Sequence, residues 1–107
     1  MTDNLISPER PITLEGKKHT LHGSVHVLKE IQQEFDKDIY DIAAGGTFQM
    51  RFDELAKLFR IGIGEDAPTT EVVEQEIVEE MGIGEAMFLA HEWLTLAVSP
   101  KREREKT

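Results

Sequence analysis

The chain contains no cysteine, which excludes disulfide bonds, thiolate metal ligands and a cysteine nucleophile. It also lacks a long apolar run, whereas a membrane-spanning helix needs about 20 predominantly apolar residues. Residues 1–11 have no apolar segment of the kind that a signal peptide requires. These absences predict a protein without membrane segments that is not exported and stays in the cytoplasm.

Basic residues are missing from a large part of the chain. The 107 residues carry a formal net charge of −9, and residues 61–100 contain nine acidic side chains but no lysine or arginine. Such a surface repels phosphate backbones, so we expect no nucleic-acid partner. Two interpretations of the acidity stay open: it keeps the protein soluble, or it attracts a basic partner.

The histidines form no recognisable metal-binding motif. Three of them lie close together in the sequence, at positions His19, His22 and His26. Ser24 is predicted to start a helix, so His22 lies outside that helix and does not share a face with His26. His91-Glu92 matches half of the HExxH zinc motif, but Thr95 stands where the second histidine is needed. We therefore expect no catalytic residue, metal or cofactor, and a half-buried, hydrogen-bonded His91.

The most apolar part of the chain lies near its C-terminal end. Ten of the thirteen residues over 86–98 are apolar. Gly84 and Glu85 favour the start of a helix, and Pro100 ends it. At helical spacing, one face holds Ala86, Ala90, Trp93, Leu94 and Ala97. A helix with so much apolar surface is covered by its own domain or by a partner, and we expect the other elements to pack around it.

Phe88 is the candidate functional residue of this helix. It projects into the polar sector, near Glu92 and Thr95. Either the N-terminal hairpin covers Phe88, or the ring is an exposed aromatic anchor of the kind found in interface hot spots. The second interpretation predicts a partner-binding surface made of Met87, Phe88, His91 and Glu92.

The remaining patterns predict the fold class. Alternating residues over 12–21, with a turn at Gly16-Lys17-Lys18, indicate a β-hairpin. Helices are expected over 25–35, 38–45, 53–62 and 71–81, with N-caps at Ser24, Asp38, Asp53 and Thr70. We predict an α+β fold, mostly α-helical, in which an N-terminal β-hairpin packs on four to five helices. Residues 11–100 form one globular domain, 1–10 a flexible lead-in and 101–107 a charged, disordered tail.

Three segments resemble a known group of proteins: ITLEGKKHTL, FDELAKLFRIGI and MGIGEAMFLAHEWLTLAV. Over residues 11–98 the chain resembles the small tail assembly chaperone-like proteins of phages, prophages and gene transfer agents. The resemblance implies a non-enzymatic chaperone in the bacterial host cytoplasm that keeps the hydrophobic tape-measure protein soluble during virion assembly. It supplies no catalytic residue.

Two other functions fit the residues as well. One is a structural tail tube or tail-completion component that is retained in the particle. The other is an acidic DNA mimic or inhibitor of a basic protein, which the acidic residues over 61–100 suggest. A homo-oligomer is compatible with each of these functions.

Overall fold

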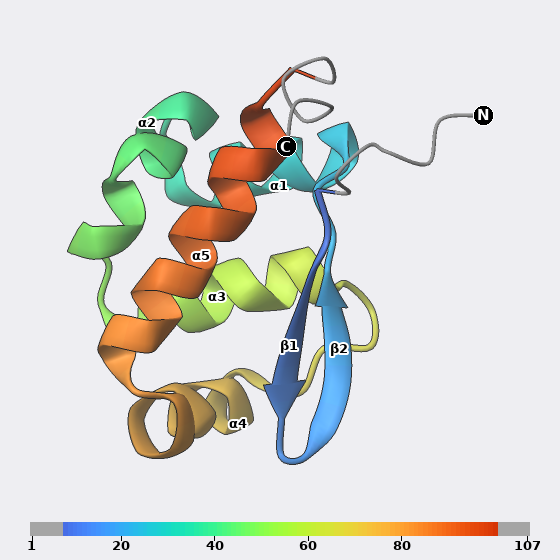
Figure 1. Ribbon diagram of the computed structural model, residues 1–107, viewed down its shortest axis with the longest axis vertical. Coiled ribbons are helices and arrows are strands. Elements are labelled where there is room, and N and C mark those ends of the chain that lie inside the picture. Colours follow the sequence, from blue (N-terminus) through green and yellow to red (C-terminus); the bar gives the residue numbers. More distant parts are fainter. Residues whose placement is uncertain (1–7, 101–107) are drawn as a thin grey trace.

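The computed structural model describes residues 8–100; residues 1–7 and 101–107, which include most of the predicted lead-in and the whole predicted tail, lie outside the described part. The fold is α+β and mostly helical, as predicted, with a two-stranded antiparallel hairpin before the helices (Figure 1). The elements are β1 (Arg10–Leu14), β2 (Lys17–Leu21), α1 (Val25–Phe35), α2 (Ile39–Ala44), the 3-10 turn η1 (Gly46–Gln49), α3 (Phe52–Ile63), α4 (Thr70–Gln75), the π-helical segment η2 (Glu76–Met81) and α5 (Ile83–Val98).

The hairpin turn lies one residue earlier than the sequence suggests. Leu14 pairs with Lys17, so Glu15 and Gly16 alone form the turn. Both have positive φ angles, 52° and 77°, as a tight two-residue hairpin turn requires, and glycine adopts this conformation without steric cost. Lys17 and Lys18, predicted to lie in the turn, therefore belong to β2. The hairpin contributes three buried side chains to the core: Ile12, Leu14 and Leu21.

The first two helices begin where their capping residues predict. The Ser24 hydroxyl accepts a hydrogen bond from the backbone N–H of Val27 at the start of α1. The Asp38 carboxylate does the same for the backbone N–H of Tyr40 at the start of α2. Each cap satisfies a backbone donor that the helix itself leaves unpaired.

The predicted caps of the next two helices are wrong. α3 is capped at Arg51, whose backbone N–H donates to the Glu54 carboxylate at 2.9 Å. Asp53 instead accepts hydrogen bonds from the Arg51 guanidinium, and this contact lowers the pKa of the Asp53 carboxyl. α4 is capped by Thr69 and not by Thr70. The helix expected over 71–81 is α4 followed directly by η2.

α3 occupies the centre of the fold, whereas the sequence suggested that α5 would. α3 packs against β2, α1, α4, η2 and α5, and α5 packs mainly against α2, η1, η2 and α3 (Figure 1). The reason is that α3 buries more of its surface. Its buried residues are Leu55, Ala56, Leu58, Phe59, Gly62 and Ile63, and those of α5 are Ala86, Ala90, Trp93 and Leu94.

Trp93 joins α5 to the rest of the core. Its ring is fully buried, and its Nε1–H donates to the backbone carbonyl of His22 at 3.1 Å. Gly62 of α3 lies against the ring: a Cβ atom there would be 2.5 Å from Trp93 Cη2. Glycine at this position therefore permits the close approach of α3 and α5. No helix within residues 8–100 combines the length and apolarity needed to cross a membrane.

Candidate partner-binding site

The outward face of α5 exposes a large aromatic side chain. Phe88 is 67 % exposed, so the hairpin does not cover it. Its neighbour is Phe48 of η1, which is 39 % exposed. The two rings meet edge to face, with centroids 5.2 Å apart and planes inclined by 77°, an arrangement favoured by aromatic quadrupoles. We call Phe48 and Phe88 together the aromatic pair.

A short connection places Phe48 beside α5. Gly45 ends α2, and η1 then turns the chain back toward α5. Thr47 is fully buried and its hydroxyl donates to the backbone carbonyl of Met87 at 3.3 Å. Because this bond holds η1 against α5, the side chain of the next residue, Phe48, reaches the surface next to Phe88.

His91 lies one turn beyond Phe88 and also contacts Phe48, with ring centroids 5.0 Å apart. It is half-buried as expected, but the expected hydrogen bond is absent. Its Nδ1 atom is buried and has no hydrogen-bond partner among residues 8–100. Buried polar atoms are nearly always hydrogen-bonded, so this unpaired atom is unusual.

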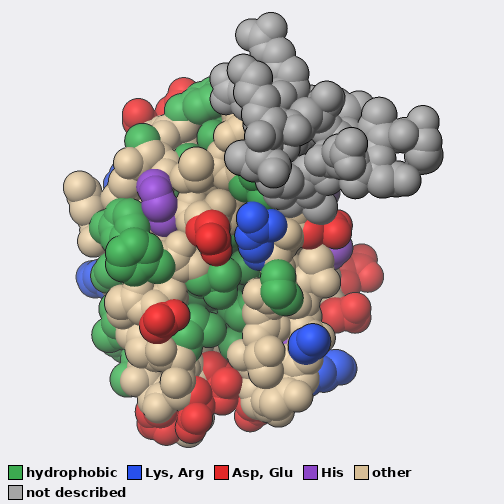
Figure 2. All heavy atoms as spheres, in the orientation of Figure 1, with side chains coloured by type: hydrophobic (Ala, Val, Ile, Leu, Met, Phe, Trp, Pro, Cys, Tyr) green, Lys and Arg blue, Asp and Glu red, His purple; other side chains and the backbone are tan. Residues whose placement is uncertain are grey.

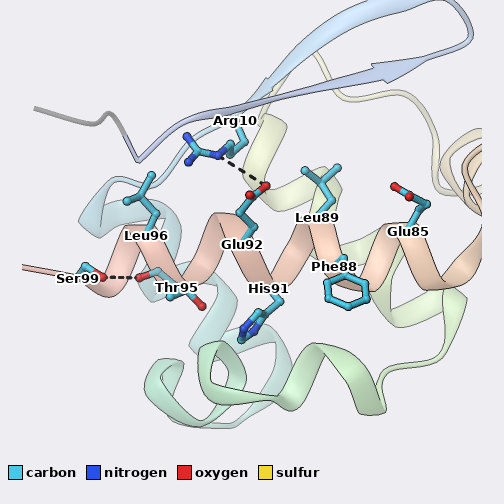
Figure 3. A pocket seen from close by; sticks show the side chains of 9 residues that line it. All are labelled: Arg10, Glu85, Phe88, Leu89, His91, Glu92, Thr95, Leu96 and Ser99. Carbon is cyan, nitrogen blue, oxygen red and sulfur yellow. Dashed lines mark hydrogen bonds and ion pairs between the residues drawn. The ribbon is translucent and has the colours of Figure 1, made fainter. Parts of the chain in front are cut away.

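A groove of about 580 Å³ opens between the start of β1 and α5 (Figure 3). It is lined by Arg10, Glu85, Phe88, Leu89, His91, Glu92, Thr95, Leu96 and Ser99. In Figure 3, Leu89, Glu92 and Leu96 point toward β1, and Phe88 and His91 toward the opposite side. Figure 2 shows hydrophobic side chains in the hollow of this face, with acidic side chains around them.

One ion pair crosses the groove. Arg10 Nε lies 3.9 Å from Glu92 Oε1, and the two side chains are 28 % and 67 % exposed. An exposed pair at this distance is worth at most about 1 kcal/mol.

The structure brings together three of the four residues predicted for the partner-binding surface. Phe88, His91 and Glu92 all line the groove. Met87 is placed differently: it is half-buried and packs against the core. Phe48 and Arg10 were not predicted to belong to the site. The sequence does show Phe48 as an aromatic residue in a short connection that follows two glycines. Residue spacing cannot show, however, that this connection lies beside α5.

The described part of the chain offers no metal-binding cluster: no three or more histidine, aspartate or glutamate side chains of residues 8–100 converge to hold an ion. Comparisons with protein-family models, with curated proteins and with solved structures found no match to this chain.

Proposed function

We propose that this protein is a non-enzymatic tail assembly chaperone of a phage or gene transfer agent. In this role it binds the tape-measure protein in the cytoplasm of the bacterial host and keeps it soluble until the tail tube forms. The resemblance of residues 11–98 to such chaperones suggests the role. The observation that supports partner binding is the aromatic pair, Phe48 and Phe88, exposed on α5 and η1.

The exposed ring of Phe88 has little value for folding. Full burial of a phenylalanine side chain is worth about 1.5–3 kcal/mol, and most of this ring stays in water. Aromatic side chains that a partner covers are, in contrast, frequent centres of binding energy. The position of Phe88 is therefore better suited to association than to the stability of the domain.

A groove beside an aromatic pair suits a helical, hydrophobic partner. Helices bind such surfaces by inserting apolar side chains at spacings of three and four residues. A chaperone must release its client when tube subunits polymerise around it, so the proposal requires a reversible contact at this surface.

Co-expression with a tape-measure segment from the same gene cluster tests the proposal. The full chain should raise the soluble fraction of that segment and co-purify with it. Phe88→Ala should weaken the complex at least tenfold, since a hot-spot aromatic contributes about 2 kcal/mol or more. Tyr40→Ala is the matched control, because Tyr40 is also an exposed aromatic, at 64 %, and does not line the groove.

Two results would contradict this function. A tape-measure segment that neither binds nor gains solubility would exclude the chaperone role. Mass spectrometry of purified particles supplies the other test: a chaperone should be absent, whereas a structural tail component would be present in many copies.

A further inference from the structure

A second hollow lies beside the groove, closer to the hairpin turn. This hollow, of about 420 Å³, is lined by Pro11, Ile12, Thr13, Gly16, Glu76, Glu80, Met81, Glu85 and Leu89. Glu85 and Leu89 line both hollows. The two hollows are therefore neighbours along α5, with β1 on one side and η2 and α5 on the other, and we call them together the β1–α5 groove.

Apolar side chains are spaced along the length of this groove. Met81, Leu89 and Leu96 line it and are half-buried, so each still presents surface to solvent. From Glu85 to Ser99, the part along α5 is about 21 Å long at 1.5 Å rise per residue. The apolar side chains of α5 on this side, Leu89 and Leu96, lie about two helical turns apart, and polar residues lie between them and at both ends.

The charges around the groove are mainly of one sign. Its lining includes four glutamates, Glu76, Glu80, Glu85 and Glu92, and one arginine, Arg10. Arg10 pairs with Glu92, and Glu76 accepts the backbone N–H of Glu15. Glu80 and Glu85 are exposed. A partner with lysine or arginine beside its apolar side chains would be attracted to this rim.

The edge of β1 argues against an extended occupant. A peptide strand that joins a sheet needs a row of backbone N–H and C=O groups along the edge. β1 has only five residues, and one of them is Pro11, which has no N–H. Proline on an edge strand blocks such additions. The groove is thus better matched to a helix, which satisfies its own backbone hydrogen bonds.

We infer that the β1–α5 groove accepts a basic amphipathic helix of the partner. The apolar stripe of that helix packs on Met81, Leu89 and Leu96, and its flanking lysine or arginine side chains face Glu80 and Glu85. The inference rests on the proposed protein-binding function and deepens it, because it names the element of the partner that is recognised.

Three synthetic peptides of about 16 residues test the inference on the full chain by fluorescence anisotropy. The first has leucines at i, i+3, i+4 and i+7 with lysines flanking the stripe. The second keeps the leucines but has glutamates in place of the lysines. The third is the lysine peptide with two central prolines, which prevent a helix. The lysine peptide should bind at least tenfold more tightly than either of the others.

Variants of the chain locate the binding surface. Glu85→Lys should weaken the lysine peptide about fivefold at low salt, with a smaller effect at high salt because ions screen exposed charges. Glu65→Lys is the control: it makes the same charge change on an exposed residue outside the groove and should have less than a twofold effect. Leu89→Ser should weaken binding at least tenfold, with circular dichroism verifying the fold.

Each outcome is decisive. Equal binding of the lysine and glutamate peptides, or equal effects of Glu85→Lys and Glu65→Lys, would overturn the inference. Tight binding of the proline peptide would overturn the helical occupant. If Phe88→Ala abolished tape-measure capture and Glu85→Lys did not weaken it, the groove would be wrong and the chaperone function would stand. Selective binding of the lysine peptide without tape-measure capture would support the groove and contradict the proposed partner.

Discussion

The two faces of α5 differ in both the size and the exposure of their apolar residues. The inner face is fully buried and combines two small residues, Ala86 and Ala90, with Trp93 and Leu94. The outer face exposes Phe88, a large ring that meets the ring of Phe48 edge to face at the surface. One helix therefore has an inner face that fixes the core and an outer face with apolar area that folding does not use.

The two faces of α5 allow the stability of the domain and its binding of a partner to be tested separately. Apolar area stabilises a fold in proportion to the surface removed from water, so substitutions on the inner face should reduce the free energy of unfolding. Substitutions on the outer face should leave that free energy nearly unchanged and reduce partner binding. The following variants test this division, in order of the expected effect on stability.

Trp93→Ala should have the largest effect. Removal of a buried tryptophan ring leaves a cavity and typically costs 3–5 kcal/mol, and the His22 carbonyl would also lose its hydrogen-bond donor. We expect a decrease of about 4 kcal/mol in the free energy of unfolding, measured by chemical denaturation with circular dichroism. A loss below about 1 kcal/mol would show that the inner face does not hold the core together.

Gly62→Ala should have an intermediate effect. The added methyl group would lie 2.5 Å from Trp93 Cη2, and overpacking of a rigid core costs about 1–3 kcal/mol. Gly84→Ala is the matched control, because Gly84 lies in α5 with open space around its Cβ position. Alanine there should stabilise the helix by up to about 1 kcal/mol. Opposite signs for the two variants would confirm that the close approach of α3 and α5 depends on Gly62.

The sequence predicts local features of this fold well. The hairpin and the helices follow from residue periodicity, and the caps at Ser24 and Asp38 follow from side chains that bond to nearby backbone groups. The predicted N-cap of α3 was wrong because the Asp53 carboxylate can bond either to a backbone N–H of the helix or to the Arg51 side chain. The Asp53 carboxylate pairs with the Arg51 guanidinium, the Glu54 carboxylate accepts the Arg51 backbone N–H, and Arg51 is therefore the N-cap residue. Neighbours in the sequence do not decide which contact forms.

Features that depend on distant contacts were not predictable in the same way. The apolar pattern of α5 resembles that of a central helix, but α3 is central because its buried face meets the hairpin and four helical segments. The candidate site shows the same limit. Phe88 could be selected from its place in the polar sector of α5, whereas Phe48 reaches it through Thr47, whose partner Met87 is forty residues away. No periodicity encodes that contact.

The smallest expected effect on stability belongs to the aromatic pair, and it tests the comparison most directly. Phe88→Ala should lower the free energy of unfolding by no more than about 1 kcal/mol, because most of its ring is in water. Phe48→Ala should cost about 1–2 kcal/mol, because its ring is only 39 % exposed. The edge-to-face contact of the two rings adds about 0.5–1.5 kcal/mol beyond the buried area. A double-mutant cycle measured by chemical denaturation gives the coupling of the two rings, which should be near the lower end of that range. Both single variants should weaken the tape-measure complex far more than they weaken the fold. If Phe88→Ala alone lowered the free energy of unfolding by more than about 2 kcal/mol, the outer face of α5 would also belong to the folding core. Its exposed aromatic ring would then be explained by folding, and not by the binding of a partner.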